Sequence, residues 1–106
     1  MILVFARVPK ETSEKIYLEI LKKKLALSIS IVDTKTIDQE LNLKEDSILI
    51  IKTRKDLFNR ILQVIKSIDA SINEIFSVKV IDIDPEFYQL LESETSLKKI
   101  REAENA

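Results

Sequence analysis

The hydrophobic and polar positions of this chain change period several times, and each change predicts a new element of secondary structure. Residues 2–8 alternate as a strand does, and the second face of this strand is also apolar because it carries Leu3 and Phe5. A helical spacing of apolar residues follows, with Thr12 as the expected N-cap of a helix that runs to about residue 25. The segment 27–31, LSISI, alternates again and predicts a second strand.

A similar strand and helix occupy the middle of the chain. The polar segment 33–45 predicts a turn and an edge strand. The continuous apolar run 48–51 is typical of a central strand that is covered on both faces. Thr53 then fits an N-cap, with Asp56 three residues later as an approximate capping box, and helical spacing continues over 57–68.

The last part of the chain predicts one more strand, over 75–83, and a short helix. Asp84 fits the N-cap of this helix, and Pro85 fits its first turn. The order strand, helix, strand, strand, helix, strand predicts an α+β fold, a ferredoxin-like βαββαβ sandwich with an added C-terminal helix. We assign residues 1–93 to this domain and 94–106 to a helical or frayed tail.

This pattern leaves one face of the predicted sheet uncovered. Two helices cover a single face, yet Leu3, Phe5 and one side of 48–51 point to the other. Leaving such side chains in water would forfeit about 1.5–3 kcal/mol for each. We therefore expect the open face, with Leu3 and Phe5 in it, to be an interface between copies of this chain in a homo-oligomer.

Composition removes most familiar active sites. The 106 residues include no Cys, no His and no Gly, so thiolate and imidazole chemistry and glycine-rich phosphate loops are excluded. The formal net charge of −1 gives no general attraction to nucleic acid or to acidic membranes.

The apolar start MILVFARV is too short for a signal peptide, and no stretch has the length of a membrane span. We expect a soluble, cytoplasmic protein without catalytic residues, and many Ile and Lys residues suit a thermophilic source.

Two charged clusters remain as candidate sites. Lys52 and Arg54 lie where a strand meets a helix start, where free backbone N–H groups favour anions, although cations at element ends are commonly only solvated. Asp82, Asp84 and Glu86 form an acidic cluster whose oxygens favour Mg, Ca or Mn. Its alternative role is structural, with Asp84 as helix cap and Glu86 complementing the helix dipole. A divalent cation is accordingly the one cofactor that the sequence suggests.

Three segments resemble the CutA family of divalent-ion tolerance proteins: ILIIKTRKDL with its Lys52-Thr53 pair, KKLALSISI, and DPEFYQLL with Pro85. The resemblance implies a ferredoxin-like subunit in a trimer similar to the nitrogen-regulatory PII proteins, a link to divalent cations, and no enzymatic activity. Ser28 stands at the family's Cys position, and the family's His and Trp positions are also changed. Copper ligation by thiolate or imidazole is therefore not implied here.

Three functional classes follow from these observations. The first is a CutA-like homotrimer associated with divalent cation tolerance or binding. The second is a PII-like sensor that binds a small anion between subunits, with Lys52 and Arg54 as its anchors. The third, a nucleic-acid-binding module, is least favoured, because it would need exposed aromatic residues on the sheet and a basic face.

Overall fold

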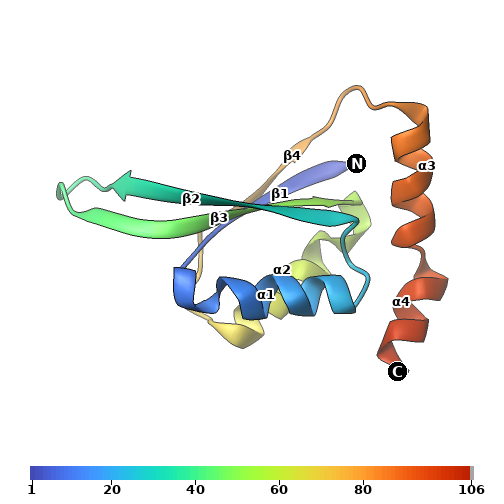
Figure 1. Cartoon of the computed structure of the whole chain (residues 1–106), viewed down its shortest axis with the longest axis horizontal. Helices are drawn as coiled ribbons and strands as arrows, with labels where there is room; N and C mark the ends of the chain where they lie inside the picture. The colour runs from blue at the N-terminus through green and yellow to red at the C-terminus, as the bar shows by residue number, and fades with distance from the viewer. Residues whose placement is uncertain (106) are drawn as a thin grey trace.

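The computed structural model describes residues 1–105 and has the predicted ferredoxin-like order of elements, followed by two C-terminal helices. Figure 1 shows their arrangement. The elements are β1 Ile2–Val8, α1 Lys10–Lys22, β2 Ser28–Ile37, β3 Leu43–Thr53, the 3-10 helix η1 Lys55–Leu57, α2 Phe58–Ile68, β4 Ile75–Lys79, α3 Pro85–Glu94 and α4 Leu97–Glu104. The predicted fold class is confirmed.

The four strands form one antiparallel sheet in the order β2-β3-β1-β4. β1 lies in the middle and pairs with β3 from Ile2 opposite Thr53 to Val8 opposite Ser47. Helices α1 and α2 lie together on one face of the sheet, below it in Figure 1. Within residues 1–105, no helix layer covers the opposite face, as the uncovered pattern of β1 predicted.

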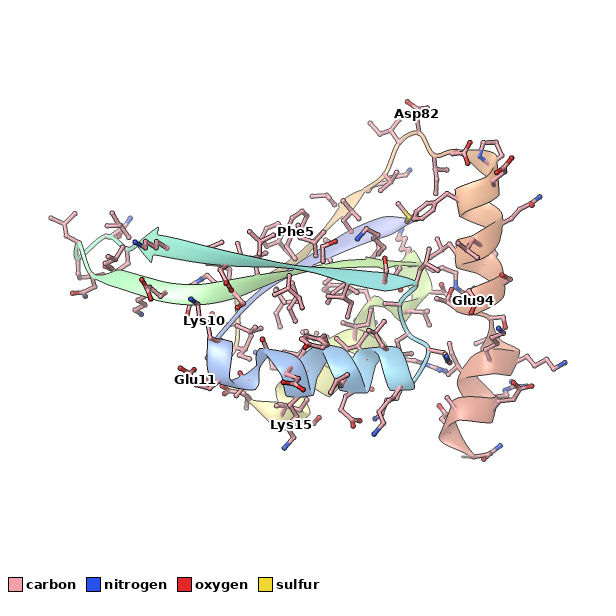
Figure 2. All side chains as sticks on the ribbon, in the orientation of Figure 1. Phe5, Lys10, Glu11, Lys15, Asp82 and Glu94 are labelled. Atoms are coloured by element: carbon pink, nitrogen blue, oxygen red, sulfur yellow. The ribbon has the colours of Figure 1, made fainter. Side chains whose placement is uncertain are left out.

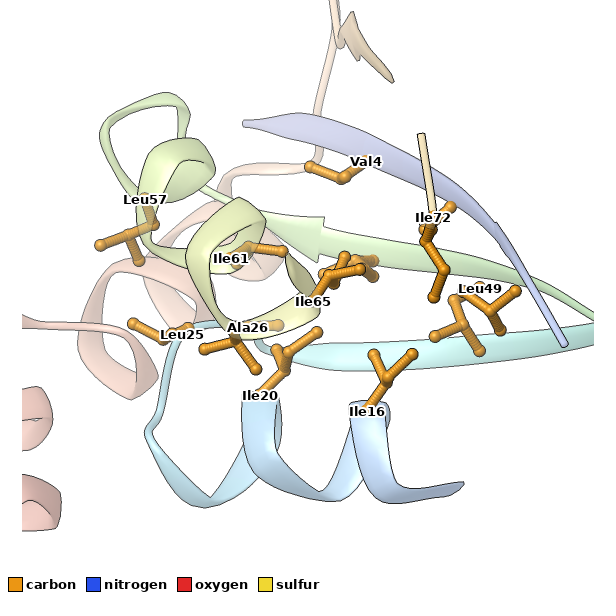
Figure 3. Packing of buried hydrophobic residues seen from close by; sticks show 14 of the residues in the cluster. Val4, Ile16, Ile20, Leu25, Ala26, Leu49, Leu57, Ile61, Ile65 and Ile72 are labelled. Atoms are coloured by element: carbon orange, nitrogen blue, oxygen red, sulfur yellow. The ribbon is translucent and has the colours of Figure 1, made fainter. Parts of the chain in front are cut away.

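The hydrophobic core lies between this helix layer and the sheet. Alternate residues of β1 are buried there, and α1 and α2 each contribute isoleucines that are fully enclosed. Figure 3 shows these side chains meeting between the two layers. Among the largest of them are Ile16 and Ile20 of α1, Leu49 and Ile51 of β3, and Ile61 and Ile65 of α2.

The polar segment 33–45 belongs to a long hairpin, so the predicted turn and edge strand there were only partly right. β2 continues to Ile37 and β3 already begins at Leu43. These polar residues stay extended because each strand supplies the other's backbone hydrogen bonds. The Oδ1 of Asp38 accepts hydrogen bonds from the backbone N–H groups of residues 40 and 42, at 3.0 Å each, and so closes the turn.

Two predicted helix caps were wrong. Helix α1 begins at Lys10, directly after Pro9, and Thr12 lies inside its first turn. Thr53 is the last residue of β3, where its Oγ1 donates a 2.6 Å hydrogen bond to the carbonyl of Leu25. A buried hydroxyl needs a partner, and here the partner is the carbonyl of Leu25, just after α1, and not a backbone N–H of the following helix.

The third cap prediction is confirmed. The Oδ2 of Asp84 accepts a hydrogen bond of 3.2 Å from the backbone N–H of Phe87, and Pro85 occupies the first turn of α3. β4 is shorter than the predicted 75–83, because the chain leaves the sheet after Lys79 and crosses to α3. No helix within residues 1–105 has the length and apolarity to cross a membrane.

Residues 94–106, expected as a helical or frayed tail, include α4. This helix starts at Ser96, whose Oγ accepts a hydrogen bond of 3.3 Å from the backbone N–H of Lys99. The side chain of Ile100 is only 1% exposed and belongs to the core cluster. The last residue, 106, lies outside the described residues. α4 is therefore part of the packed structure.

Helix α1 ends in a Schellman motif built without glycine. The backbone N–H of Leu25 donates to the carbonyl of Ile20 at 3.2 Å, and that of Lys24 donates to the carbonyl of Leu21 at 3.1 Å. The motif places Lys24 in the left-handed region, at φ 59°. A residue with a Cβ is strained in this region, whereas glycine is not.

We predict that Lys24→Gly stabilises the protein by about 0.5–1 kcal/mol, because relief of the left-handed strain exceeds the entropy cost of glycine. The measurement is the free energy of unfolding by urea at a fixed protein concentration. Lys23→Gly is the matched control, since Lys23 has φ −83° and gains nothing from glycine. It should destabilise by about 0.5–1 kcal/mol. Equal effects of the two substitutions would contradict this account of the helix end.

Candidate functional site

The face of the sheet opposite α1 and α2 carries a continuous apolar surface, which we call the open face. Strand register places its residues side by side, because directly paired residues of antiparallel strands point to the same face. Within this single chain, three of its side chains are 43% or more exposed. The apolar members of the open face are Leu3, Phe5, Val32, Ile48, Ile50, Phe76 and Val78.

Strand register places Phe5 at the centre of the open face, and Figure 2 shows it on the side of the sheet away from α1. It pairs with Ile50 on one side and Phe76 on the other. The rings of Phe5 and Phe76 are stacked, with centroids 5.3 Å apart and an angle of 14° between their planes. Leu3 is the next residue on the same face and pairs with Val78. Both residues predicted as interface, Leu3 and Phe5, thus belong to one apolar surface.

A charged cluster that the sequence analysis missed borders the open face. The guanidinium of Arg7 donates to Asp46 at 2.5 Å through Nη1 and to Glu74 at 3.0 Å through Nε. The hydrogen bond with Asp46, together with Glu74, raises the pKa of Arg7. The partners of Arg7 come from β3 and from the loop before β4, so no local motif could have revealed them. This cluster lines a cavity of about 220 Å³.

Lys52, the first predicted anion-binding residue, lies on the open face. Its register partners are Leu3 on β1 and Ser28 on β2. Its Nζ donates a 2.8 Å hydrogen bond to the hydroxyl of Ser30. A hydroxyl leaves the charge of Lys52 unneutralised, so the ammonium stands at the polar border of the apolar surface.

Arg54, the second predicted anion-binding residue, points to a different part of the molecule. Its Nη2 donates a 2.8 Å hydrogen bond to the carbonyl of Thr95 and lies 3.5 Å from a carboxylate oxygen of Asp56. Its Nη1 lies 3.8 Å from a carboxylate oxygen of Glu92. The Arg54 side chain is only 18% exposed. The structure therefore separates the head groups of Lys52 and Arg54 and uses Arg54 to join the end of β3 to the two C-terminal helices.

The acidic cluster is spread along the crossing segment and the start of α3. Asp82 projects from this segment away from the sheet, as Figure 2 shows. Asp84 is engaged as the cap of α3, and Glu86 lies in the first turn of that helix. Among residues 1–105 of one chain, no three His, Cys, Asp or Glu side chains come together as a metal site. Metal binding by Asp82, Asp84 and Glu86 stays a prediction, and it would need further ligands from another copy of the chain or from water.

We predict that Arg54→Ala destabilises the protein by about 2 kcal/mol, because it leaves the carbonyl of buried Thr95 without its donor and removes the ion pairs with Asp56 and Glu92. Backbone amides of residues 85–104 should exchange hydrogen faster, whereas those of α1 should change much less. The measurement is hydrogen exchange followed by mass spectrometry. Arg101→Ala, in exposed α4 surface, is the control and should leave exchange unchanged. Equal acceleration in α1 and in the C-terminal helices would contradict the role given to Arg54.

Comparison with solved structures places this fold among CutA proteins. CutA1 from Pyrococcus horikoshii superposes with a TM-score of 0.82 at 23% identity, over 91% of this chain and 99% of that one. A protein described as the periplasmic divalent cation tolerance protein CutA from Archaeoglobus fulgidus gives 0.80 at 22% identity, over 91% and 100% of the two chains. The PII-like protein CutA from Nostoc sp. PCC 7120, in its apo form, gives 0.83 at 17%, over 92% and 99%.

Comparison at the level of sequence agrees with the fold. No match to this chain is found among curated proteins. The family model described as CutA1 divalent ion tolerance protein matches residues 2–94, which run from the start of β1 to the end of α3. The chain therefore belongs to the CutA1 divalent ion tolerance family.

Proposed function

We propose that this protein is a non-enzymatic homotrimer that takes part in the tolerance of divalent cations, with the open face as its subunit interface. The single observation that supports this most is the apolar surface centred on Phe5. Membership of the CutA1 family supports the link to divalent cations, and relatives of the same fold are described as divalent cation tolerance proteins. The number of three subunits rests on the resemblance to the CutA family.

The open face is too apolar to be an ordinary solvent-exposed surface. Large contiguous apolar patches on soluble proteins commonly mark interaction sites. Each large apolar side chain that becomes fully buried contributes about 1.5–3 kcal/mol. The seven members of the open face together supply a central apolar region, while Lys52 and the Arg7 cluster supply a polar border. An apolar centre with a polar rim is the usual composition of a subunit interface.

We predict that the native chain is a trimer and that Phe76→Glu makes it a monomer. Phe76 is on edge strand β4 and is already 51% exposed in the single chain, so a glutamate there leaves the subunit core intact. In a buried interface the same glutamate would be desolvated without a partner. The measurement is the absolute mass by light scattering on a sizing column at two protein concentrations.

Leu18→Glu is the matched control for this substitution. Leu18 is 45% exposed, close to the value for Phe76, but it lies on α1 outside the open face. This variant should keep the mass of a trimer. Circular dichroism checks that both variants remain folded. A native monomer, or a trimer that survives Phe76→Glu, would overturn the proposed interface.

The cation role that we propose uses carboxylate oxygens, because the sequence contains no Cys or His. Asp82 and Glu86 are the best available ligands, since Asp84 is already occupied as a helix cap. Hard divalent cations take 6 or more oxygen ligands, and residues 1–105 of one chain do not bring together even three carboxylates as a metal site. In the proposed trimer, neighbouring copies or bound water would supply the remaining ligands.

We predict that the double substitution Asp82→Asn and Glu86→Gln weakens Mn²⁺ binding about tenfold. Each substitution removes one negative charge and one oxygen ligand from the site. Isothermal titration with MnCl₂ measures the difference. Glu14→Gln, an exposed carboxylate substitution on α1, should bind like the native protein. The proposed cation site would be contradicted if the native protein showed no heat of Mn²⁺ binding. It would also be contradicted if the native protein, the double variant and Glu14→Gln bound Mn²⁺ with equal affinity.

The alternative function is a sensor of a small anion. It rests on Lys52, whose ammonium lies at the border of the proposed interface, because Arg54 is already held by internal partners. If inorganic pyrophosphate protects the native protein against heat unfolding, and if the substitution Lys52→Gln abolishes this protection, the anion-sensor alternative is favoured.

A location in the cytoplasm also remains a proposal, because one structural relative is described as periplasmic.

A further inference from the structure

A second candidate site lies in the helix layer, where α4 packs beside the ends of α1 and α2. The cavity there has a volume of about 360 Å³, within the range of small-molecule sites. In Figure 1, α4 lies next to the C-terminal end of α1. The cavity is on the helix side of the sheet, so the proposed subunit interface on the open face leaves it accessible.

The inner wall of this cavity is apolar. Leu25, Val64 and Ile100 line it, and each is less than 10% exposed and belongs to the core cluster. Leu25 follows α1, Val64 lies on α2 and Ile100 lies on α4, so three elements build the wall together. Such a wall favours a ligand with a hydrocarbon or aromatic part.

The rim of the cavity is polar and carries more positive than negative charge. Lys23 and Arg60 contribute two cations, whereas Glu104 contributes the one carboxylate among the lining residues. Nη1 of Arg60 lies 3.9 Å from Oε1 of Glu104, with both side chains about half exposed. Nζ of Lys23 lies 4.0 Å from Glu19 of its own helix, also at the surface. Such long, exposed pairs contribute little free energy, so both cations remain available to a ligand.

α4 completes this cavity and lies beyond the family match. The match to the CutA1 family model ends at residue 94, the last residue of α3, whereas α4 spans Leu97–Glu104. Ile100 supplies part of the apolar wall and Glu104 part of the rim. The combination of apolar wall and cationic rim therefore depends on a segment outside the shared family domain.

We propose that this cavity binds a small amphipathic carboxylate, with Arg60 and Lys23 holding the carboxylate and the wall of Leu25, Val64 and Ile100 enclosing the apolar part. Guanidinium groups bind carboxylates through charge-assisted hydrogen bonds. In the unliganded chain the carboxylate of Glu104 lies 3.9 Å from Arg60, so a ligand carboxylate replaces an interaction of the same kind. A medium-chain fatty acid and an aryl carboxylic acid share this chemistry.

The first experiment is isothermal titration of the full chain with sodium octanoate, which carries both chemical features. We expect saturable binding of one octanoate per chain. Acetate lacks the apolar part and 1-octanol lacks the charge, so each should bind at least about tenfold more weakly. Absence of saturable octanoate binding, or equal binding of 1-octanol, would overturn the proposal. Sodium benzoate in place of octanoate then tells whether a chain or a ring is preferred.

Substitutions on the rim locate the site. Arg60→Gln should weaken octanoate binding about tenfold, because it removes a charge-assisted hydrogen bond. Glu104→Gln should tighten binding about twofold to fivefold, because it removes the competing carboxylate. Arg101→Gln changes an exposed arginine of α4 that does not line the cavity, and it should bind like the native protein. Equal affinities of the Arg60→Gln and Arg101→Gln variants would show that octanoate binds elsewhere and would overturn the proposal.

Discussion

The structure depends on one constraint. Its two central strands, β1 and β3, are apolar on both faces of the sheet, and the helix layer covers only one of these two faces. β1 and β3 pair over the full length of β1, from Ile2 to Val8. One set of their side chains forms the core with α1 and α2, and the other set forms the open face. The core stabilises the subunit, and burial of the open face would favour the association of subunits that we propose. Both properties follow from the same short apolar segments.

The charged groups are arranged around these apolar layers. Arg7 and Lys52 border the open face, Arg54 joins β3 to the C-terminal helices, and Arg60 stands at the helix-layer cavity. These four cationic side chains therefore differ in whether they can bind a ligand, and the difference depends on the groups that each of them already contacts. A guanidinium held by a buried carbonyl and two carboxylates is structural, whereas a cation that faces a hydroxyl or a distant carboxylate at the surface can meet a ligand.

Period and local sequence predicted the elements well, and they predicted contacts well only where the partner is near in sequence. The cap of α3 depends on Asp84 and a backbone group three residues later, and it was predicted correctly. Thr53 has an equally good cap pattern, but its hydroxyl bonds to Leu25, 28 residues away, because β3 passes the end of α1. The Arg7 cluster joins residues up to 67 positions apart. Such sites arise from the fold, so the local pattern of a single sequence does not reveal them.

The central position of β1 also affects how the chain is made. β1 is synthesised before both of the strands that pair with it: β3 ends at Thr53 and β4 at Lys79. During synthesis both apolar faces of β1 stay exposed until most of the domain has been translated. An unpaired apolar strand is prone to aggregate. Chaperone binding to nascent β1 would protect such a strand until its partners have been made. The feature that gives the finished subunit its core and its open face is thus its main hazard before folding is complete.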